Sequence, residues 1–261
     1  MNPAFSYPGG KRKMLKYILP LIPLHKTYLE PFAGGLAVFL AKERARVEVI
    51  NDLNREIANF YRYVHFHFDS LISELEWYLH SRENFELILK NCGLTELQRA
   101  ARWYLLKVSS FSGFSDSYAR DKNSFRGFSK ERHLPMIAEL HERLEGVYIE
   151  NKDWEEVFKF FDGEETFIYL DPPYCTGDSG IYDAFSGFDM QRLRNRLDRA
   201  KGKWILSCDD SEICREIFAD FDFISIPIKY SAGTNTTERK QKAELLVVSD
   251  GIDLSKTEIL K

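Results

Sequence analysis

Hydrophobic residues recur with two different periods along the chain, and the change between them divides the sequence into three stretches. Near the start, a short strand-like run at 28–30 is followed by Gly34 and Gly35, an apolar helical run, and a β-branched run at 47–50. This order predicts a strand, a helix and a second strand that ends in an acidic residue. Such units are typical of parallel sheets covered by helices.

Helical periodicity with few strand signals occupies the middle of the chain, from about residue 54 to 144. We therefore predict a mostly helical insertion at 56–144 within a domain formed by residues 1–55 and 145–261. Inside the insertion, residues 109–127 (SSFSGFSDSYARDKNSFRG) are rich in Ser, Gly, Phe and Asp. We predict a long ordered loop there, because its aromatic side chains need to pack or stack.

Strand signals return after the insertion and alternate with helical segments. The predicted strands are 147–149, 166–170, 204–206, 223–228 and 244–248. The predicted helices are 153–161, 190–200 and 211–219. The connection at 229–243 is too short for a crossover helix, so the last two strands are expected to form an antiparallel hairpin at the sheet edge.

Composition narrows the class of protein. The 261 residues are 44% hydrophobic and 29% charged, as in a globular protein with a substantial core. No apolar run has the length of a membrane span and no signal-peptide pattern opens the chain, so we expect a cytoplasmic protein. The four cysteines lack paired spacing, and His65 and His67 would point to opposite sides of a helix. Neither a disulfide framework nor a metal site is expected.

The net charge of −4 argues against a protein that coats nucleic acid with its whole surface. Local basic stretches would have to carry any contact with DNA, and two are candidates. The residues that we expect to touch DNA are Arg120, Lys122, Asn123, Arg126, Asn235, Arg239 and Lys240. Arginine and asparagine suit guanine and adenine edges, whereas other cations would hold phosphates. Ordinary solvated surface remains the alternative for both stretches.

The most specific chemical signal is the tetrapeptide DPPY at 171–174, directly after the apolar run at 167–170. Two prolines stiffen the turn and remove two N–H donors, so the carboxylate of Asp171 and the carbonyl of Pro172 can face one ligand. An exocyclic NH2 group needs two such acceptors, and the ring of Tyr174 can stack on a base rotated out of the double helix. The tetrapeptide alone leaves a structural turn as the alternative.

A second signal, PFAGG at 31–35, also follows a predicted strand and precedes a helix. Its small residues would let a ligand approach the backbone, and the helix N-terminus favours a carboxylate, so a methionine moiety would fit there. Asp52, at the end of the next strand, could accept both hydroxyl groups of a ribose. Each signal is weak alone, and together with DPPY in this order they become specific.

In this order the motifs resemble the Dam-type, alpha-class DNA adenine methyltransferases over nearly the whole chain. Residues 7–11 (YPGGK) resemble the amino-terminal motif of that family, 31–35 its first cofactor motif, 51–52 its ribose-binding acid and 171–174 its catalytic motif. The resemblance implies an α/β fold: a Rossmann-like class I methyltransferase sheet with an antiparallel C-terminal hairpin. It also implies that the helical insertion is a target-recognition lobe.

The resemblance further implies a cofactor, S-adenosylmethionine, and a reaction at the N6 amine of a flipped-out adenine in double-stranded DNA. The implied cofactor-binding residues are Tyr7, Lys11, Phe32, Gly34, Asp52, Asp153 and Asp171. The implied catalytic residues are Asp171, Pro172, Tyr174 and Lys11. Two of these have simpler alternatives: Lys11 as an exposed lysine that opens a helix, and Asp153 as a helix N-cap.

Two other functions remain open at the level of sequence. One is an amino-methyltransferase that acts on cytosine N4, RNA or a protein glutamine, although Asp rather than Ser or Asn at position 171 disfavours it. The other is a non-catalytic DNA-binding protein on the same scaffold. The loop at 109–127 differs from that of GATC-specific members, so a GATC target is not expected. We expect a monomer, and the sequence leaves open whether a cognate restriction enzyme accompanies it.

Overall fold

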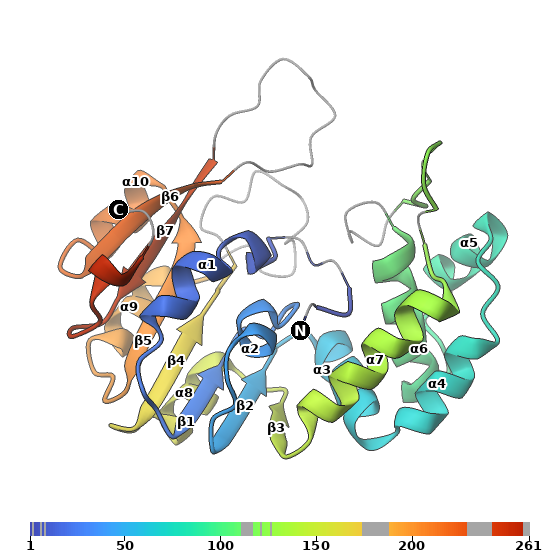
Figure 1. Cartoon of the computed structure of the whole chain (residues 1–261), viewed down its shortest axis with the longest axis horizontal. Helices are drawn as coiled ribbons and strands as arrows, with labels where there is room; N and C mark the ends of the chain where they lie inside the picture. The colour runs from blue at the N-terminus through green and yellow to red at the C-terminus, as the bar shows by residue number, and fades with distance from the viewer. Residues whose placement is uncertain are drawn as a thin grey trace. The chain divides into compact units, whose positions relative to one another are not determined.

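A single mixed sheet organises the strands of the protein, which we describe from a computed structural model. The structure describes residues 1, 3–5, 7, 9–110, 117–120, 122–125, 127–173, 188–228 and 242–257. Within this part of the chain the sheet has seven strands in the order β3-β2-β1-β4-β5-β7-β6 (Figure 1). The strands are β1 (Thr27–Glu30), β2 (Val47–Asn51), β3 (Val147–Glu150), β4 (Thr166–Leu170), β5 (Lys203–Asp209), β6 (Asp222–Ile228) and β7 (Lys242–Val248).

Most of the strands whose pairing is resolved residue by residue run parallel. Strand β1 pairs in parallel with β2 and with β4, and β4 pairs in parallel with β5. Strand β7 lies antiparallel between β5 and β6. The antiparallel pairing of the last two strands agrees with the expectation from their short connection, whereas residues 229–241 lie outside the described part of the chain.

Packing divides the chain into two compact units, which we describe separately. Unit 1 contains residues 1–12, 34–41 and 51–152, and unit 2 contains 13–33, 42–50 and 153–261. The helices of unit 1 are α2 (Ala37–Ala41), α3 (Arg55–Phe66), α4 (Phe68–Glu76), α5 (Arg82–Lys90), α6 (Glu96–Ser109) and α7 (Lys130–Leu144). The helices of unit 2 are α1 (Leu15–Ile18), α8 (Trp154–Phe161), α9 (Met190–Leu197) and α10 (Glu212–Ile217).

The two units include short elements that the sequence pattern did not predict. Helix α1 and the 3₁₀ helices η1 (Lys11–Lys13) and η2 (Leu19–Leu21) follow the amino terminus, and η5 (Leu254–Lys256) lies near the carboxyl end. The helical stretch expected at 56–144 holds α3 to α7, but unit 1 also takes in the glycine turn and β3. No helix among the described residues has the length and apolar character needed to cross a bilayer.

The core of unit 2 lies on one face of the sheet. Leu29, Ile168 and Leu206 project from neighbouring strands onto this face and are fully buried. Helices α8, α9 and α10 cover them through side chains such as Phe158 and Leu193. Because adjacent strand residues point to opposite faces, the residues between these apolar ones form a second, separate surface.

The second face of the same strands is also buried, but it carries polar groups. Strand β4 is buried along its whole length, which is the burial expected of a central parallel strand. Tyr28 pairs in register with Glu48 on β2 and lies two residues before Glu30 on β1. Tyr169 on β4 and Ser207 on β5 are likewise buried. These polar side chains need hydrogen-bond partners, because an unsatisfied buried polar group is costly.

In unit 1, an aromatic cluster fixes the amino-terminal segment. Phe60 on α3 and Tyr104 on α6 stack in parallel, with ring centroids 5.1 Å apart. Phe5 packs edge-on against Phe60 and against Trp103, and the Tyr104 hydroxyl donates to the Ala4 carbonyl at 3.1 Å. The cluster therefore holds the segment that leads to the YPGGK motif.

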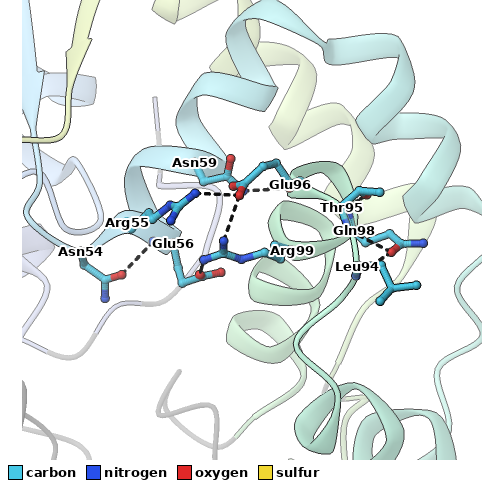
Figure 2. Close-up of polar contacts among 9 residues, drawn as sticks. All are labelled: Asn54, Arg55, Glu56, Asn59, Leu94, Thr95, Glu96, Gln98 and Arg99. Atoms are coloured by element: carbon cyan, nitrogen blue, oxygen red, sulfur yellow. Dashed lines mark hydrogen bonds and ion pairs between the residues drawn. The ribbon is translucent and has the colours of Figure 1, made fainter.

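A network of charged side chains joins the first turns of α3 and α6 (Figure 2). Arg99 pairs with Glu56 and also donates to Glu96 Oε1 at 3.0 Å. Glu96 Oε1 accepts a second bond, of 2.9 Å, from Arg55, and the Glu96 carbonyl accepts from Asn59 Nδ2 at 2.8 Å. Arg99 and Glu56 are about three-quarters buried, so water screens their attraction less than it screens an exposed pair.

The Arg99–Glu56 pair should therefore contribute measurably to the stability of unit 1. In a double-mutant cycle of Arg99→Met and Glu56→Gln, urea unfolding should give a coupling free energy of about 1 kcal/mol. The control is Arg82 and Glu86, which lie 3.9 Å apart with both side chains about half exposed. Their coupling should be near zero, and equal coupling in the two cycles would contradict the role that we assign to burial.

Candidate active site

The glycine turn of unit 1 is fixed through both backbone polar groups of Gly34. Its N–H donates to Asp52 Oδ2 at 2.9 Å, and its carbonyl accepts from the Tyr61 hydroxyl at 2.7 Å. Gly34 has a φ of +45°, which disfavours residues with a side chain. A Cβ at Gly34 or Gly35 would also lie 3.3 or 3.0 Å from the side chain of Tyr7. The small residues expected to admit a ligand thus also admit the tyrosine of the YPGGK motif.

Asp52 follows β2 and is 9% exposed. Its Oδ1 accepts from the Asn54 N–H at 2.8 Å, and its Oδ2 accepts from Gly34. Burial raises the pKa of Asp52 to about 6, although the two backbone N–H groups act in the opposite direction. A carboxylate offers about four acceptor positions, so each Asp52 oxygen can accept a further donor.

Two asparagines that sequence reasoning did not single out hold the end of β2. Asn151 Nδ2 donates to the Asp52 carbonyl at 2.7 Å. The Asn51 side chain accepts from the Lys152 N–H at 2.9 Å and donates to the Lys152 carbonyl at 3.1 Å. These bonds join segments about 100 residues apart in sequence, which explains why no local pattern revealed them.

The YPGGK segment forms a turn in which Gly10 N–H donates to the Tyr7 carbonyl at 3.0 Å. Lys11 opens η1 but is only 3% exposed, and its Nζ donates to the Gly9 carbonyl at 2.8 Å. The alternative of an exposed lysine is therefore wrong. Lys107 Nζ lies 5.4 Å from the centre of the Tyr7 ring, within the range of a cation–π interaction.

In unit 2, Asp171 directly follows β4 and is partly buried. Ser207 Oγ lies 3.2 Å from Asp171 Oδ1 and 2.9 Å from the Tyr169 hydroxyl. Pro172 is buried, as expected for a stiff turn that packs against the protein. Tyr174 lies outside the described residues, so its stacking role stays a prediction.

Aromatic residues surround the side chain of Phe32 in unit 2. Its ring centroid lies 6.1 Å from that of Trp154 and 5.5 Å from that of Phe188, with the latter pair edge to face. Asp153 precedes Trp154 and caps α8, because its Oδ1 accepts from the Glu155 N–H at 3.0 Å. Arg192 donates to the same Asp153 oxygen at 2.9 Å. The N-cap alternative for Asp153 is thus observed, and its contact with a cofactor stays a prediction.

The candidate DNA-contacting residues fall partly within the described chain. Arg120, Lys122 and Asn123 are exposed in unit 1. The other four, Arg126, Asn235, Arg239 and Lys240, lie outside the described residues. Their contacts with DNA therefore stay predictions from the sequence.

The imidazole of His80 contacts several residues of the loop that carries the three exposed candidates for DNA contact. Its Nε2 is hydrogen-bonded to the Tyr118 hydroxyl at 3.0 Å, and the two rings stack with centroids 5.1 Å apart. Phe125 meets the His80 ring edge to face at 5.0 Å. A Cβ at Gly127 would lie 2.0 Å from His80 Cε1, so only glycine fits there without a shift of the ring. Sequence reasoning missed His80, because no local motif marks it.

A mixed α/β sheet, an acid beside a glycine turn and a second acid followed by two prolines agree with the class expected from the sequence, the amino-group methyltransferases. The chain belongs to the D12 class N6 adenine-specific DNA methyltransferase family, whose pattern it matches over residues 7–232. Adenine in DNA is the substrate of this family, so the alternatives of cytosine, RNA, a protein glutamine and a non-catalytic regulator are wrong.

Relatives in this family cover the chain almost from end to end. The chain is 32% identical to the type II methyltransferase M1.LlaDCHI of Lactococcus lactis subsp. cremoris, with 96% of each chain aligned. It is 26% identical to the type II methyltransferase M.MjaIII of Methanocaldococcus jannaschii, over 95% of this chain and 99% of the relative. It is 24% identical to the DNA adenine methylase of Escherichia coli K12, over 95% of both chains.

The contact between Gly127 and His80 gives a test of the loop's structure. Gly127→Ala should destabilise the protein by about 1–3 kcal/mol more than Gly146→Ala in urea unfolding, because overpacking adds to backbone strain. Gly146 is a matched control, since its φ is +71° and no atom lies within 4 Å of an added Cβ. His80→Ala should remove the difference between the two alanine variants. Equal losses in the wild-type background would show that the ring moves aside at no cost.

Proposed function

We propose that the protein transfers a methyl group from S-adenosylmethionine to the N6 amine of an adenine rotated out of double-stranded DNA. The observation that carries this proposal is the carboxylate of Asp171, held in place at the end of a buried strand and followed by Pro172. Two adjacent acceptors at the end of a rigid strand suit an amine that must be oriented with both of its N–H bonds engaged.

The residues of unit 1 fit the methyl donor. Asp52 offers carboxylate oxygens in a buried position, and a ribose presents two hydroxyl donors that such an acid can bind. The ring of Tyr7 lies on the glycine turn and gives an aromatic face that favours a cation such as a sulfonium. We assign the backbone at Gly34 to the methionine part and Lys11 to its carboxylate.

In unit 2 we assign Phe32 and Asp153 to the adenine of the cofactor, the first by apolar contact and the second by accepting from its amine. The observed pairing of Asp153 with Arg192 orients that carboxylate. S-Adenosylmethionine supplies an already activated methyl group when bound, so the chain does not need a nucleophile of its own.

We assign the DPPY motif to the N6 amine that receives the methyl group. The Asp171 carboxylate and the Pro172 carbonyl would accept the two N–H bonds and draw them out of conjugation with the ring, which frees the nitrogen lone pair. The same negative oxygens would stabilise the positive charge that develops on N6. We assign stacking on the target base to Tyr174.

The proposal also divides the chain into a catalytic domain and an inserted lobe. We assign residues 1–55 and 145–261 to a Rossmann-like class I catalytic domain with an antiparallel C-terminal hairpin, and 56–144 to an inserted target-recognition lobe. Support comes from the three exposed residues Arg120, Lys122 and Asn123, which lie on the loop that His80 organises. Cations on a loop with a fixed backbone can hold phosphates, and an amide beside them can read a base edge.

Replacement of Asp171 tests the catalytic assignment. Asp171→Ala should lower the rate of methyl transfer to mixed-sequence duplex DNA on the order of 100-fold or more, because one preorganised acceptor is lost. Its affinity for S-adenosylmethionine, measured by calorimetry, should fall only in part. The control is Asp220→Ala, whose side chain is 84% exposed and should leave the rate unchanged. If Asp171→Ala keeps more than about a tenth of the wild-type rate, Asp171 does not activate the amine.

The raised pKa of Asp52 predicts that cofactor affinity depends on pH. Above a pH of about 6 the carboxylate is ionised and accepts strongly, whereas below it the neutral acid is a weaker acceptor. Affinity for S-adenosylmethionine should therefore decrease as the pH falls through about 6. Asp52→Asn should bind more weakly at about pH 8 and lose most of this pH dependence. Wild-type affinity that is constant across the range, measured by calorimetry, would remove Asp52 from the ribose site.

A further inference from the structure

We propose that Tyr169 and Ser207 form a positioning pair that holds the carboxylate of Asp171 through a directed chain of hydrogen bonds. The inference rests on the proposed role of Asp171 and adds two residues to that site. Neither residue belongs to a motif, and both lie on the buried polar face of the sheet in unit 2.

Strand register places the three hydrogen-bonded residues, Tyr169, Ser207 and Asp171, beside one another. Strands β4 and β5 are parallel neighbours, and Leu170 pairs with Leu206. The next residues along the chain are Asp171, directly after the end of β4, and Ser207 on β5, and Ser207 Oγ lies 3.2 Å from Asp171 Oδ1. Tyr169 lies two residues before Asp171 and therefore projects to the same face of the sheet.

The number of hydroxyl hydrogen atoms determines which group donates in each of these hydrogen bonds. An ionised carboxylate only accepts, so the Ser207 hydroxyl donates to Asp171 Oδ1 across 3.2 Å. A hydroxyl has one hydrogen, so the 2.9 Å bond between Tyr169 and Ser207 must then be donated by the tyrosine. The Leu170 carbonyl, 3.4 Å from Ser207 Oγ, competes for the same hydrogen but is neutral and more distant. The charged acceptor makes the stronger bond.

Burial makes this series of hydrogen bonds rigid. Ser207 is 0% exposed and Tyr169 is 1% exposed, so water does not compete for either hydroxyl. A carboxylate held from behind by such a chain needs little reorganisation when charge develops on the amine that it faces. The pair should therefore act on the rate of methyl transfer rather than on the binding of either substrate.

Tyr28 is a matched control for the loss of a buried tyrosine hydroxyl. It lies on β1 and is as buried as Tyr169, and its hydroxyl donates to Glu30 Oε2 at 2.6 Å. Tyr28→Phe therefore removes a buried hydrogen bond to a carboxylate but leaves Tyr169 and Ser207 unchanged. It separates a general loss of stability from an effect on Asp171.

The experiment measures kcat, both KM values and Tm for four variants of the full-length protein. We expect Ser207→Ala to lower kcat about 10-fold and Tyr169→Phe to lower it about 3- to 10-fold, with each KM within about twofold of the wild type. Ser207→Thr, which keeps the hydroxyl, should restore most of the kcat that alanine loses. Tyr28→Phe should lower Tm but leave kcat unchanged.

Two outcomes would overturn the inference: wild-type kcat in both Ser207→Ala and Tyr169→Phe, or an equal loss of kcat in Tyr28→Phe. Asp171→Ala, assayed in parallel, keeps this result distinct from the proposed function. If Asp171→Ala is inactive while Ser207→Ala and Tyr169→Phe are fully active, only the positioning pair is wrong. If Asp171→Ala is itself active, the assignment of the catalytic carboxylate is wrong.

Discussion

Parallel pairing of β4 with β5 is the constraint on which the surroundings of the candidate acid of unit 2, Asp171, depend. Both strands are central in the sheet, so their side chains are buried on both faces and each polar one needs a partner inside the protein. The pairing of Leu170 with Leu206 places Ser207 of β5 beside Asp171, which follows the end of β4. A shift of one residue would turn Ser207 to the other face, where Leu206 and Cys208 pack in the core.

The two candidate acids are held by different means. Asp52 is fixed by backbone N–H groups, from Gly34 in the glycine turn and from Asn54 at the start of α3. Asp171 is in contact with a side-chain hydroxyl that belongs to a neighbouring strand. Backbone donors do not depend on which side chains surround them, whereas a hydroxyl can be removed by a single substitution. A substitution of Ser207 would therefore change the environment of Asp171 from 36 residues away in the sequence.

Sequence patterns located the strands and both acids, because these features are local. The strand predicted at 166–170 matches β4 residue for residue, and Asp52 and Asp171 directly follow strands. The four-residue helix α1 was missed because one turn is too short to show a period. The partners Ser207, Asn151 and His80 were missed for another reason. They lie 29 to 99 residues from the groups they contact, and only the register of strands or the packing of helices brings them there.

Contacts with the ring of His80 order the described part of the loop at 109–127 in unit 1. Tyr118, Phe125 and Gly127 contact one imidazole, and Ala119 N–H donates to the Ser109 carbonyl at 2.9 Å, so these described residues of the loop are held in place. Arg120, Lys122 and Asn123 of the same loop are exposed. If these residues contact DNA as proposed, substitutions of them would change which phosphates or base edges are contacted. Substitution of His80 would instead remove its contacts with Tyr118, Phe125 and Gly127 together.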